Sequence, residues 1–178
     1  MKLAGAAFRR GLAAAILSAA MMTAADKKPS DFSLHDLAGK KVQLRDYRGK
    51  IVVLNFWATW CGPCREEMPM IVEAEKAWRA KGIVFVAVSL DDAKTRKDVP
   101  AFLDRYHVEF PVWTGASADE LDKLHMGEGV PDTAFLDEAG MIVARILGET
   151  HRSEIDERLT WLTGDRKSAA PPALINHL

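Results

Sequence analysis

The chain has 178 residues, 48% of them apolar, which suffices for one domain with a packed core but is short for two. Its 24 basic and 25 acidic side chains give a formal net charge of -1. No stripe of Lys and Arg interleaved with aromatic residues is visible, so composition and charge argue against nucleic acid as a partner.

The first 25 residues differ in character from the rest. Lys2, Arg9 and Arg10 precede an apolar run of 15 residues, "GLAAAILSAAMMTAA", that ends in small side chains. The run is shorter than the roughly 18 to 20 residues that a membrane-spanning helix needs. We therefore predict a secretory signal peptide at 1–25 and export to the periplasm, with an uncleaved membrane anchor over 9–25 as the alternative.

The next segments alternate between strand and helix patterns. Residues 32–50 predict a small hairpin, and the apolar, β-branched run 51–57 predicts a strand that is covered on both faces. A helical pattern follows over 62–80, with Gly82 ending it, and 83–89 predicts a second buried strand.

The second half continues the alternation. The patterns predict a helix over 98–107, a strand over 111–114, a capped helix over 117–125, a hairpin over 133–147 and a helix over 153–162. The chain thus divides into the leader, one domain over 26–164 and a mobile tail over 165–178. This order predicts an α/β fold in which helices flank a central mixed sheet.

The two cysteines, Cys61 and Cys64, fall where the first buried strand meets its helix. A structural staple is the weakest interpretation, because so short a loop removes little entropy from the unfolded chain. A zinc site would need two further ligands, and the five histidines show no close pair at ligand spacing along the sequence. We therefore assign no metal ligands and favour a redox-active pair.

The position of the pair gives each sulfur a role. Cys61 precedes the helix, where unpaired N–H groups and the positive end of the helix dipole stabilise a thiolate, so it is the expected attacking sulfur. Cys64 returns beneath it after nearly one turn and can resolve a mixed disulfide. Pro63 suits the first helical turn, and Gly62 allows a partner chain to approach closely.

The stretches "LNFWATWCGPCREEMP" and "DLAGKKVQLRDYRGK", together with Val130-Pro131, resemble the thioredoxin superfamily. More narrowly, they resemble the exported TlpA/ResA-like thiol-disulfide oxidoreductases of the redoxin group. The resemblance covers about residues 31 to 163 and implies a thioredoxin-like fold with an N-terminal β-hairpin.

The resemblance also implies roles for further residues. Pro131 would be a cis-proline facing the cysteines, with the Val130 backbone pairing to an incoming peptide, and Trp60 would belong to the docking rim. Glu67 would accept a proton from Cys64. A solvated first-turn glutamate is the alternative interpretation of Glu67. Asn55 stands where cytosolic thioredoxins carry a buried aspartate.

The expected function is a monomeric protein-disulfide reductase whose only redox group is the Cys61–Cys64 pair, with no cofactor. Gly-Pro between the cysteines is typical of the reducing end of the CxxC proteins. The resemblance implies exported disulfide-containing partners, such as apocytochrome c or metal-site assembly factors, and a membrane thiol-disulfide transporter as electron donor. A thiol peroxidase and a copper-binding chaperone are the alternatives.

Overall fold

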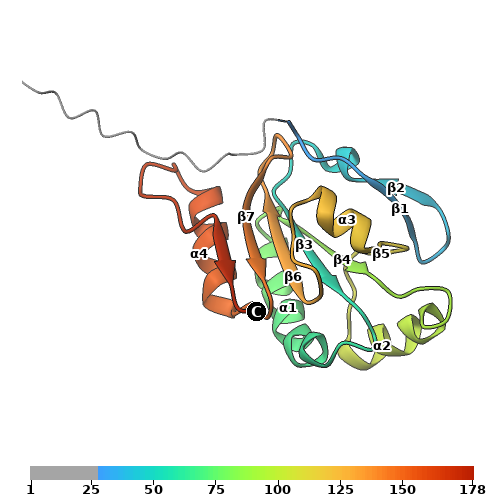
Figure 1. Cartoon of the computed structure of the whole chain (residues 1–178). Helices are drawn as coiled ribbons and strands as arrows, with labels where there is room; N and C mark the ends of the chain where they lie inside the picture. The colour runs from blue at the N-terminus through green and yellow to red at the C-terminus, as the bar shows by residue number, and fades with distance from the viewer. Residues whose placement is uncertain (1–27) are drawn as a thin grey trace, which may run out of the picture.

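The computed structural model describes residues 28–178, and within them eight strands form a single mixed sheet (Figure 1). The predicted signal peptide lies outside the described residues. The strands are β1 (Ser33–Asp36), β2 (Lys41–Gln43), β3 (Val52–Trp57), β4 (Val84–Ser89), β5 (Val112–Thr114), β6 (Asp132–Leu136), β7 (Ile142–Leu147) and β8 (Leu174–Asn176).

Four α-helices and two short 3-10 helices connect the strands over the same described residues. They are η1 (Leu44–Tyr47), α1 (Gly62–Arg79), η2 (Arg96–Asp98), α2 (Val99–Tyr106), α3 (Ala118–Lys123) and α4 (Arg152–Thr163). Among residues 28–178, no helix is both long enough and apolar enough to cross a membrane.

The sheet order is β2-β1-β5-β4-β3-β6-β7-β8. The strands β3, β4 and β5 run parallel, while β6 lies antiparallel to β3 and β7 lies antiparallel to β6. The parallel strands are joined through helices, as parallel neighbours require. The predicted α/β architecture with a central mixed sheet and an N-terminal hairpin is confirmed.

Helices cover both faces of the sheet, so that the fold has three layers (Figure 1). Every residue of β3 is buried, as its unbroken apolar pattern predicts. Val53 and Trp57 pack in one core with α1, α2 and α4, whereas Leu54 and Phe56 pack in a second core with α3. Alternate side chains of one strand therefore serve two cores, which fixes β3 at the centre of the sheet.

The predicted N-terminal hairpin differs from the structure after its second strand. Residues 44–47 form η1 instead of continuing β2. This turn brings Leu44 and Tyr47 into the core that contains Trp113, and the rings of Tyr47 and Trp113 lie 5.8 Å apart. Burial of these side chains outweighs continued strand pairing.

The end of the chain corrects a second prediction, the mobile tail over 165–178. Residues 174–176 form β8, which pairs parallel with β7 at the edge of the sheet. The segment before it is held by hydrogen bonds from Trp161 Nε1 to the Ser168 carbonyl (3.1 Å) and from Arg158 Nη2 to the Pro172 carbonyl (2.8 Å). Without β8, the backbone N–H and C=O groups on the outer side of β7 would be unpaired, and three residues are enough to pair with them.

Candidate active site

Cys61 and Cys64 lie at the start of α1 and form a disulfide with an S–S distance of 1.99 Å. Cys61 is the N-cap residue of α1, and its sulfur accepts a hydrogen bond of 3.1 Å from the Cys64 backbone N–H. Cys61 is 4% exposed, whereas Cys64 is fully buried. The helix start thus places a backbone donor on the more accessible sulfur, where it favours negative charge.

The loop before Cys61 is fixed by polar contacts. The buried Asp91 carboxylate accepts hydrogen bonds from the Thr59 backbone N–H (3.0 Å), the Thr59 hydroxyl and the Ser89 hydroxyl (2.9 Å). Arg65, in the first turn of α1, donates to the Thr59 carbonyl at 2.9 Å. These contacts connect the loop to the end of β4 and to α1. They therefore hold Cys61 in position before a partner binds.

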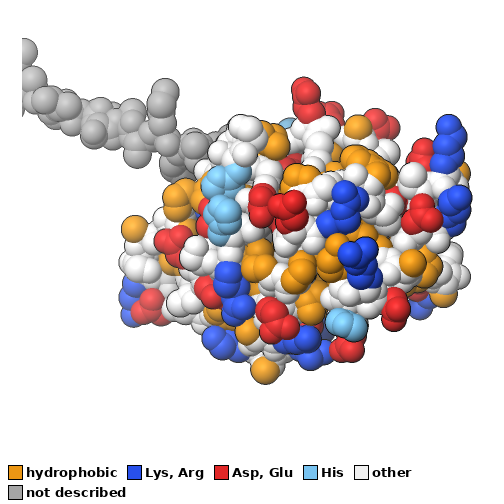
Figure 2. Space-filling view, turned by 90° about the horizontal axis from the view of Figure 1, so that it is seen from below, with side chains coloured by type: hydrophobic (Ala, Val, Ile, Leu, Met, Phe, Trp, Pro, Cys, Tyr) orange, Lys and Arg blue, Asp and Glu red, His pale blue; other side chains and the backbone are white. Residues whose placement is uncertain are grey.

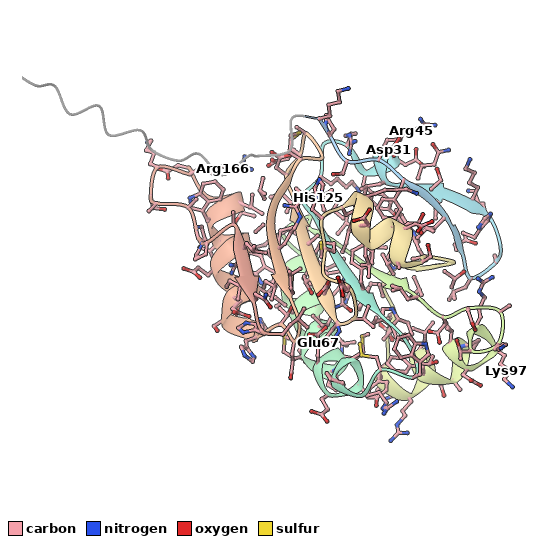
Figure 3. The ribbon with its side chains drawn as sticks, in the orientation of Figure 1. Asp31, Arg45, Glu67, Lys97, His125 and Arg166 are labelled. Atoms are coloured by element: carbon pink, nitrogen blue, oxygen red, sulfur yellow. A yellow bond between two sulfur atoms is a disulfide. The ribbon has the colours of Figure 1, made fainter. Side chains whose placement is uncertain are left out.

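Glu67 lies one turn beyond Cys64 on α1, and Figure 3 shows it in the same lower part of the molecule as the yellow disulfide. It is only 2% exposed. Its two carboxylate oxygens accept hydrogen bonds from Asn55 Nδ2 (2.6 Å) and from the Thr150 backbone N–H (2.7 Å). The structure thus excludes the alternative of a solvated surface glutamate.

The environment of Glu67 makes it a group that can exchange a proton near neutral pH. Burial is the largest influence and raises the pKa of Glu67 to about 7, against the lowering effect of the hydrogen bonds from Thr150 and Asn55. A carboxyl group with a pKa near the ambient pH is well suited to accept and return a proton. The resemblance implied a site role for Glu67, and the structure adds Thr150 and Asn55 as hydrogen-bond donors to its carboxylate.

A buried hydroxyl group completes this network. Thr133 Oγ1 receives hydrogen bonds from Asn55 Nδ2 (3.3 Å) and from the Thr150 hydroxyl (3.0 Å). Asn55 Oδ1 is buried and has no hydrogen-bond partner among the described residues. If Glu67 is protonated, a turn of the Asn55 amide offers this oxygen to the new O–H group, so both protonation states can be hydrogen-bonded.

The peptide bond between Val130 and Pro131 is cis, as the resemblance implies. The Val130 carbonyl oxygen lies 3.4 Å from Cys61 Sγ, which brings the Pro131 loop directly against the cysteine pair. Trp60, which immediately precedes Cys61, is 57% exposed. A Cβ atom at Gly62 would meet only the Arg65 side chain, at 3.8 Å, so the fold itself has room for a larger residue there.

Asp132 holds the Pro131 loop in place, a role that the sequence did not reveal. Its buried carboxylate accepts hydrogen bonds from the backbone N–H groups of Gly127 (2.7 Å) and Gly148 (3.0 Å). Burial is the main influence and raises the pKa of Asp132 to about 6, although both hydrogen bonds lower it. The side chain therefore joins the loop before Pro131 to the loop between β7 and α4.

A group of possible metal ligands lies outside the cysteine site. One ligand atom each of His151, Glu154 and His177 lie within 4.8 Å of one another. His151 and Glu154 lie at the start of α4, and His177 follows β8, so pairing at the sheet edge brings distant residues together. Sequence patterns do not indicate this group, because 26 positions separate its two histidines.

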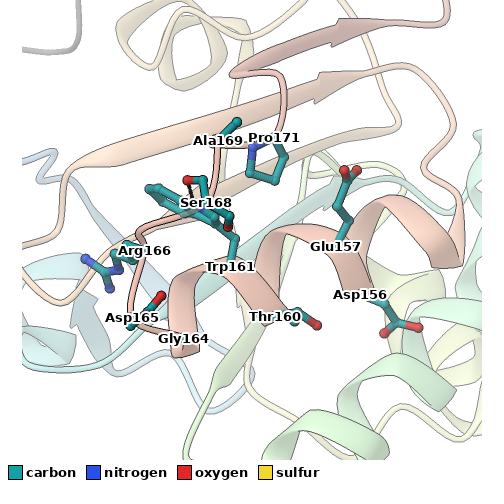
Figure 4. A pocket seen from close by; sticks show the side chains of 10 residues that line it. All are labelled: Asp156, Glu157, Thr160, Trp161, Gly164, Asp165, Arg166, Ser168, Ala169 and Pro171. Atoms are coloured by element: carbon teal, nitrogen blue, oxygen red, sulfur yellow. Dashed lines mark hydrogen bonds between the residues drawn. The ribbon is translucent and has the colours of Figure 1, made fainter.

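Surface grooves lie beside the cysteine motif and beside α4. One, of about 390 Å³, is lined by Thr59, Arg65 and the α2 residues Phe102 and Arg105, and therefore borders the cysteine motif. The other, of about 560 Å³, lies between α4 and residues 164–171 (Figure 4). None of the predicted site residues lines the second groove.

Comparison with known proteins agrees with the geometry of the site. The family model described as Redoxin matches residues 23–159. The thioredoxin-like protein YneN of Bacillus subtilis is 41% identical over 130 residues, which cover 72% of this chain and 75% of the relative. The thiol-disulfide oxidoreductase ResA of Bacillus thuringiensis is 34% identical over 137 residues, covering 77% of this chain and 78% of the relative.

A solved structure gives the same result for the fold. The thioredoxin-family thiol:disulfide interchange protein of Chlorobium tepidum has a TM-score of 0.66 and 25% identity, covering 80% of this chain and all of that one. The buried strand, the disulfide-bonded Cys-x-x-Cys pair at the helix start and the cis-proline against it are all present in this chain. The chain therefore belongs to the Redoxin family and is a thiol-disulfide oxidoreductase.

Proposed function

We propose that this chain is an exported protein-disulfide reductase, with Cys61 as the attacking sulfur and Cys64 as the resolving one. The observation that carries the proposal is the unequal setting of the two sulfurs. Cys61 is the N-cap residue, retains 4% exposure and accepts the Cys64 N–H, whereas Cys64 has no exposed surface. Of the two sulfurs, Cys61 is the more accessible to a partner, and the Cys64 N–H would stabilise its negative charge.

The first step consumes a disulfide of the partner. The Cys61 thiolate attacks one partner sulfur, a Cys61–partner S–S bond forms, the partner's own S–S bond breaks, and its second sulfur leaves as a thiolate. The groove beside Thr59 and Arg65 and the exposed Trp60 would provide surface for the partner next to the cysteine motif. The Val130 backbone, whose carbonyl oxygen lies 3.4 Å from Cys61 Sγ, suits an extended peptide.

The second step releases the partner. Cys64 gives its proton to Glu67, and the Cys64 sulfur attacks Cys61 Sγ. The Cys61–Cys64 bond forms, the Cys61–partner S–S bond breaks, and the partner sulfur leaves as a thiolate, so both partner sulfurs are now reduced. Two electrons pass from the chain to the partner. Glu67 is one turn from Cys64 on the same helix and has a pKa of about 7, which supports its role as the proton acceptor.

Our proposals for the direction of electron flow, the compartment and the partners are based on the sequence. Gly62 and Pro63 between the cysteines support a reductant, because Cys-Gly-Pro-Cys is the dithiol of thioredoxin at the reducing end of the scale. The leader at 1–25 supports export to the periplasm. The partners would be exported disulfide-containing proteins such as apocytochrome c, and a membrane thiol-disulfide transporter would return electrons to the disulfide.

Reduction of insulin by the dithiothreitol-recharged protein tests the proposal, beside peroxide consumption as the rival activity. We expect insulin reduction that both Cys61→Ser and Cys64→Ser abolish, with a mixed disulfide accumulating only on Cys64→Ser. Peroxide consumption that survives Cys64→Ser but not Cys61→Ser would instead identify a thiol peroxidase. Stoichiometric Cu⁺ binding by the reduced dithiol, without insulin reduction, would favour the copper chaperone.

A further inference from the structure

We propose that His151, Glu154 and His177 form a binding site for a borderline divalent cation, Zn²⁺ or Cu²⁺, that closes the C-terminal strand onto α4. This site is separate from the dithiol and goes beyond the proposed function. The three residues supply two imidazole nitrogens and one carboxylate oxygen, all within 4.8 Å of one another. Imidazole and carboxylate together suit Zn²⁺ and Cu²⁺ better than Mg²⁺ or Ca²⁺, which take oxygen ligands.

The backbone positions all three residues before any ion arrives. His151 is the N-cap residue of α4, and Glu154 lies in the first turn of the helix. His177 follows β8 directly, and its backbone N–H donates to the Leu147 carbonyl at 2.8 Å. Two independent elements, a helix start and a paired edge strand, thus bring the ligands to one place.

The side chains already face one another. Glu154 Oε2 accepts the His151 backbone N–H at 2.8 Å, which orients the carboxylate, and Glu154 Oε1 lies 2.8 Å from His177 Nε2. The imidazole rings of His151 and His177 have centroids 5.1 Å apart. A tetrahedral ion with bonds of about 2.0 to 2.1 Å needs ligand atoms roughly 3.4 Å apart, so rotation of exposed histidine side chains is sufficient.

The site is accessible from solvent. His151 and His177 are exposed, and Glu154 is half-buried between them. Figure 2, seen from below, shows histidine side chains gathered at the surface with acidic side chains nearby. Three protein ligands leave a fourth tetrahedral position for water, which is the arrangement of an exchangeable site and not of a closed structural one.

Binding of such an ion would hold the end of the chain against the fold. Among the described residues, β8 has β7 as its one pairing partner and forms one of the two edges of the sheet. An ion that joins His177 to His151 and Glu154 binds only when β8 is paired, so it stabilises that pairing by mass action. The expected consequence is slower exchange of the His177 amide hydrogen in the loaded protein.

The test uses the untagged full chain with the Cys61–Cys64 disulfide closed, so that no thiol can bind the ion. Calorimetric titration with ZnCl₂ should show one equivalent bound, and His177→Ala and His151→Ala should each weaken binding by at least about tenfold. His35→Ala, which changes an exposed histidine on β1, is the matched control and should bind as the unaltered chain does.

Two further measurements separate loss of a ligand from loss of the fold. The melting temperatures of His177→Ala and His151→Ala in EDTA should match that of the unaltered chain within a few degrees. Electron paramagnetic resonance of the Cu²⁺-loaded protein should show two nitrogen ligands, and one in either variant. No binding by the unaltered chain, or full binding by either variant, would overturn the proposal.

Discussion

The side chain of Asn55 donates a 2.6 Å hydrogen bond to Glu67 across the interface between β3 and α1. Both residues are buried, and the Thr150 backbone N–H holds the second carboxylate oxygen at 2.7 Å. Glu67 lies on α1, one turn after Cys64. It is therefore a titratable group close to the cysteine that must lose a proton when the mixed disulfide is resolved. The interior carboxyl group is therefore central to the chemistry that we propose.

Glu67→Gln should slow resolution of the mixed disulfide by roughly 100-fold or more, because the variant cannot accept the Cys64 proton. The fold should tolerate the change, since a turn of the Asn55 amide presents its unpaired Oδ1 to the new amide N–H group. Stopped-flow tryptophan fluorescence with a model disulfide should follow the step from pH 5 to 9. A pH-rate profile identical to that of the unaltered chain would remove Glu67 from the mechanism.

Asn55→Ala should move the pH midpoint of resolution upward. The hydrogen bond from Asn55 lowers the pKa of Glu67, so its loss raises that pKa further above about 7. Thr133→Val is the matched control, because Thr133 contacts Asn55 and Thr150 but not the carboxylate. If the midpoint moves equally in both variants, the shift does not come from the direct hydrogen bond between Asn55 and Glu67.

The stability of the oxidised protein should fall as pH rises from about 4.5 to about 7. The pKa of Glu67 rises from 4.5 to about 7 on folding, so the folded state binds more protons in this window. The raised pKa corresponds to a loss on the order of 3 kcal/mol in the free energy of unfolding.

Urea denaturation at pH 5 and pH 8 measures this loss. Asp132 contributes in the same direction at lower pH, because burial raises its pKa to about 6. Its contribution cancels when Glu67→Gln is compared with the unaltered chain, and the variant should lose less stability between the two pH values. Equal losses would mean that Glu67 is not protonated more readily in the folded state.

Much of the site follows from local sequence. The unbroken apolar run of β3 and the Cys-Gly-Pro-Cys motif after it predict a sulfur at the start of a helix, and the structure confirms that placement. The helical spacing of Glu67 also indicates burial, although its charge suggests a surface position. Glu67 lies three residues after Cys64 and four before Ile71, on the buried face of α1.

The features that the sequence did not reveal depend on contacts between distant residues. β8 has three residues after a proline-containing segment, and its pairing partner lies 29 positions earlier, from Leu174 to Arg145. No periodicity can show such pairing. The cluster of His151, Glu154 and His177 depends on β8, so it was missed for the same reason.

Ile175→Asp tests whether β8 belongs to the folded domain. Ile175 packs against the core that contains α1 and α4, so burial of a carboxylate there should lower the free energy of unfolding by about 1 to 3 kcal/mol. Leu174→Asp is the control, since Leu174 is 58% exposed and should cost little. Equal stability of both variants in urea denaturation would indicate that the segment does not pack as described.

The central claim is that the start of α1 stabilises the Cys61 sulfur as a thiolate, while the buried Cys64 serves as the resolving cysteine. Alkylation of the reduced protein by iodoacetamide at pH 6, with each cysteine followed by mass spectrometry, tests this most directly. We predict that Cys61 reacts about tenfold faster than free cysteine and that Cys64 reacts far more slowly. Equal rates at the two cysteines, or a Cys61 rate no higher than that of free cysteine, would contradict the account.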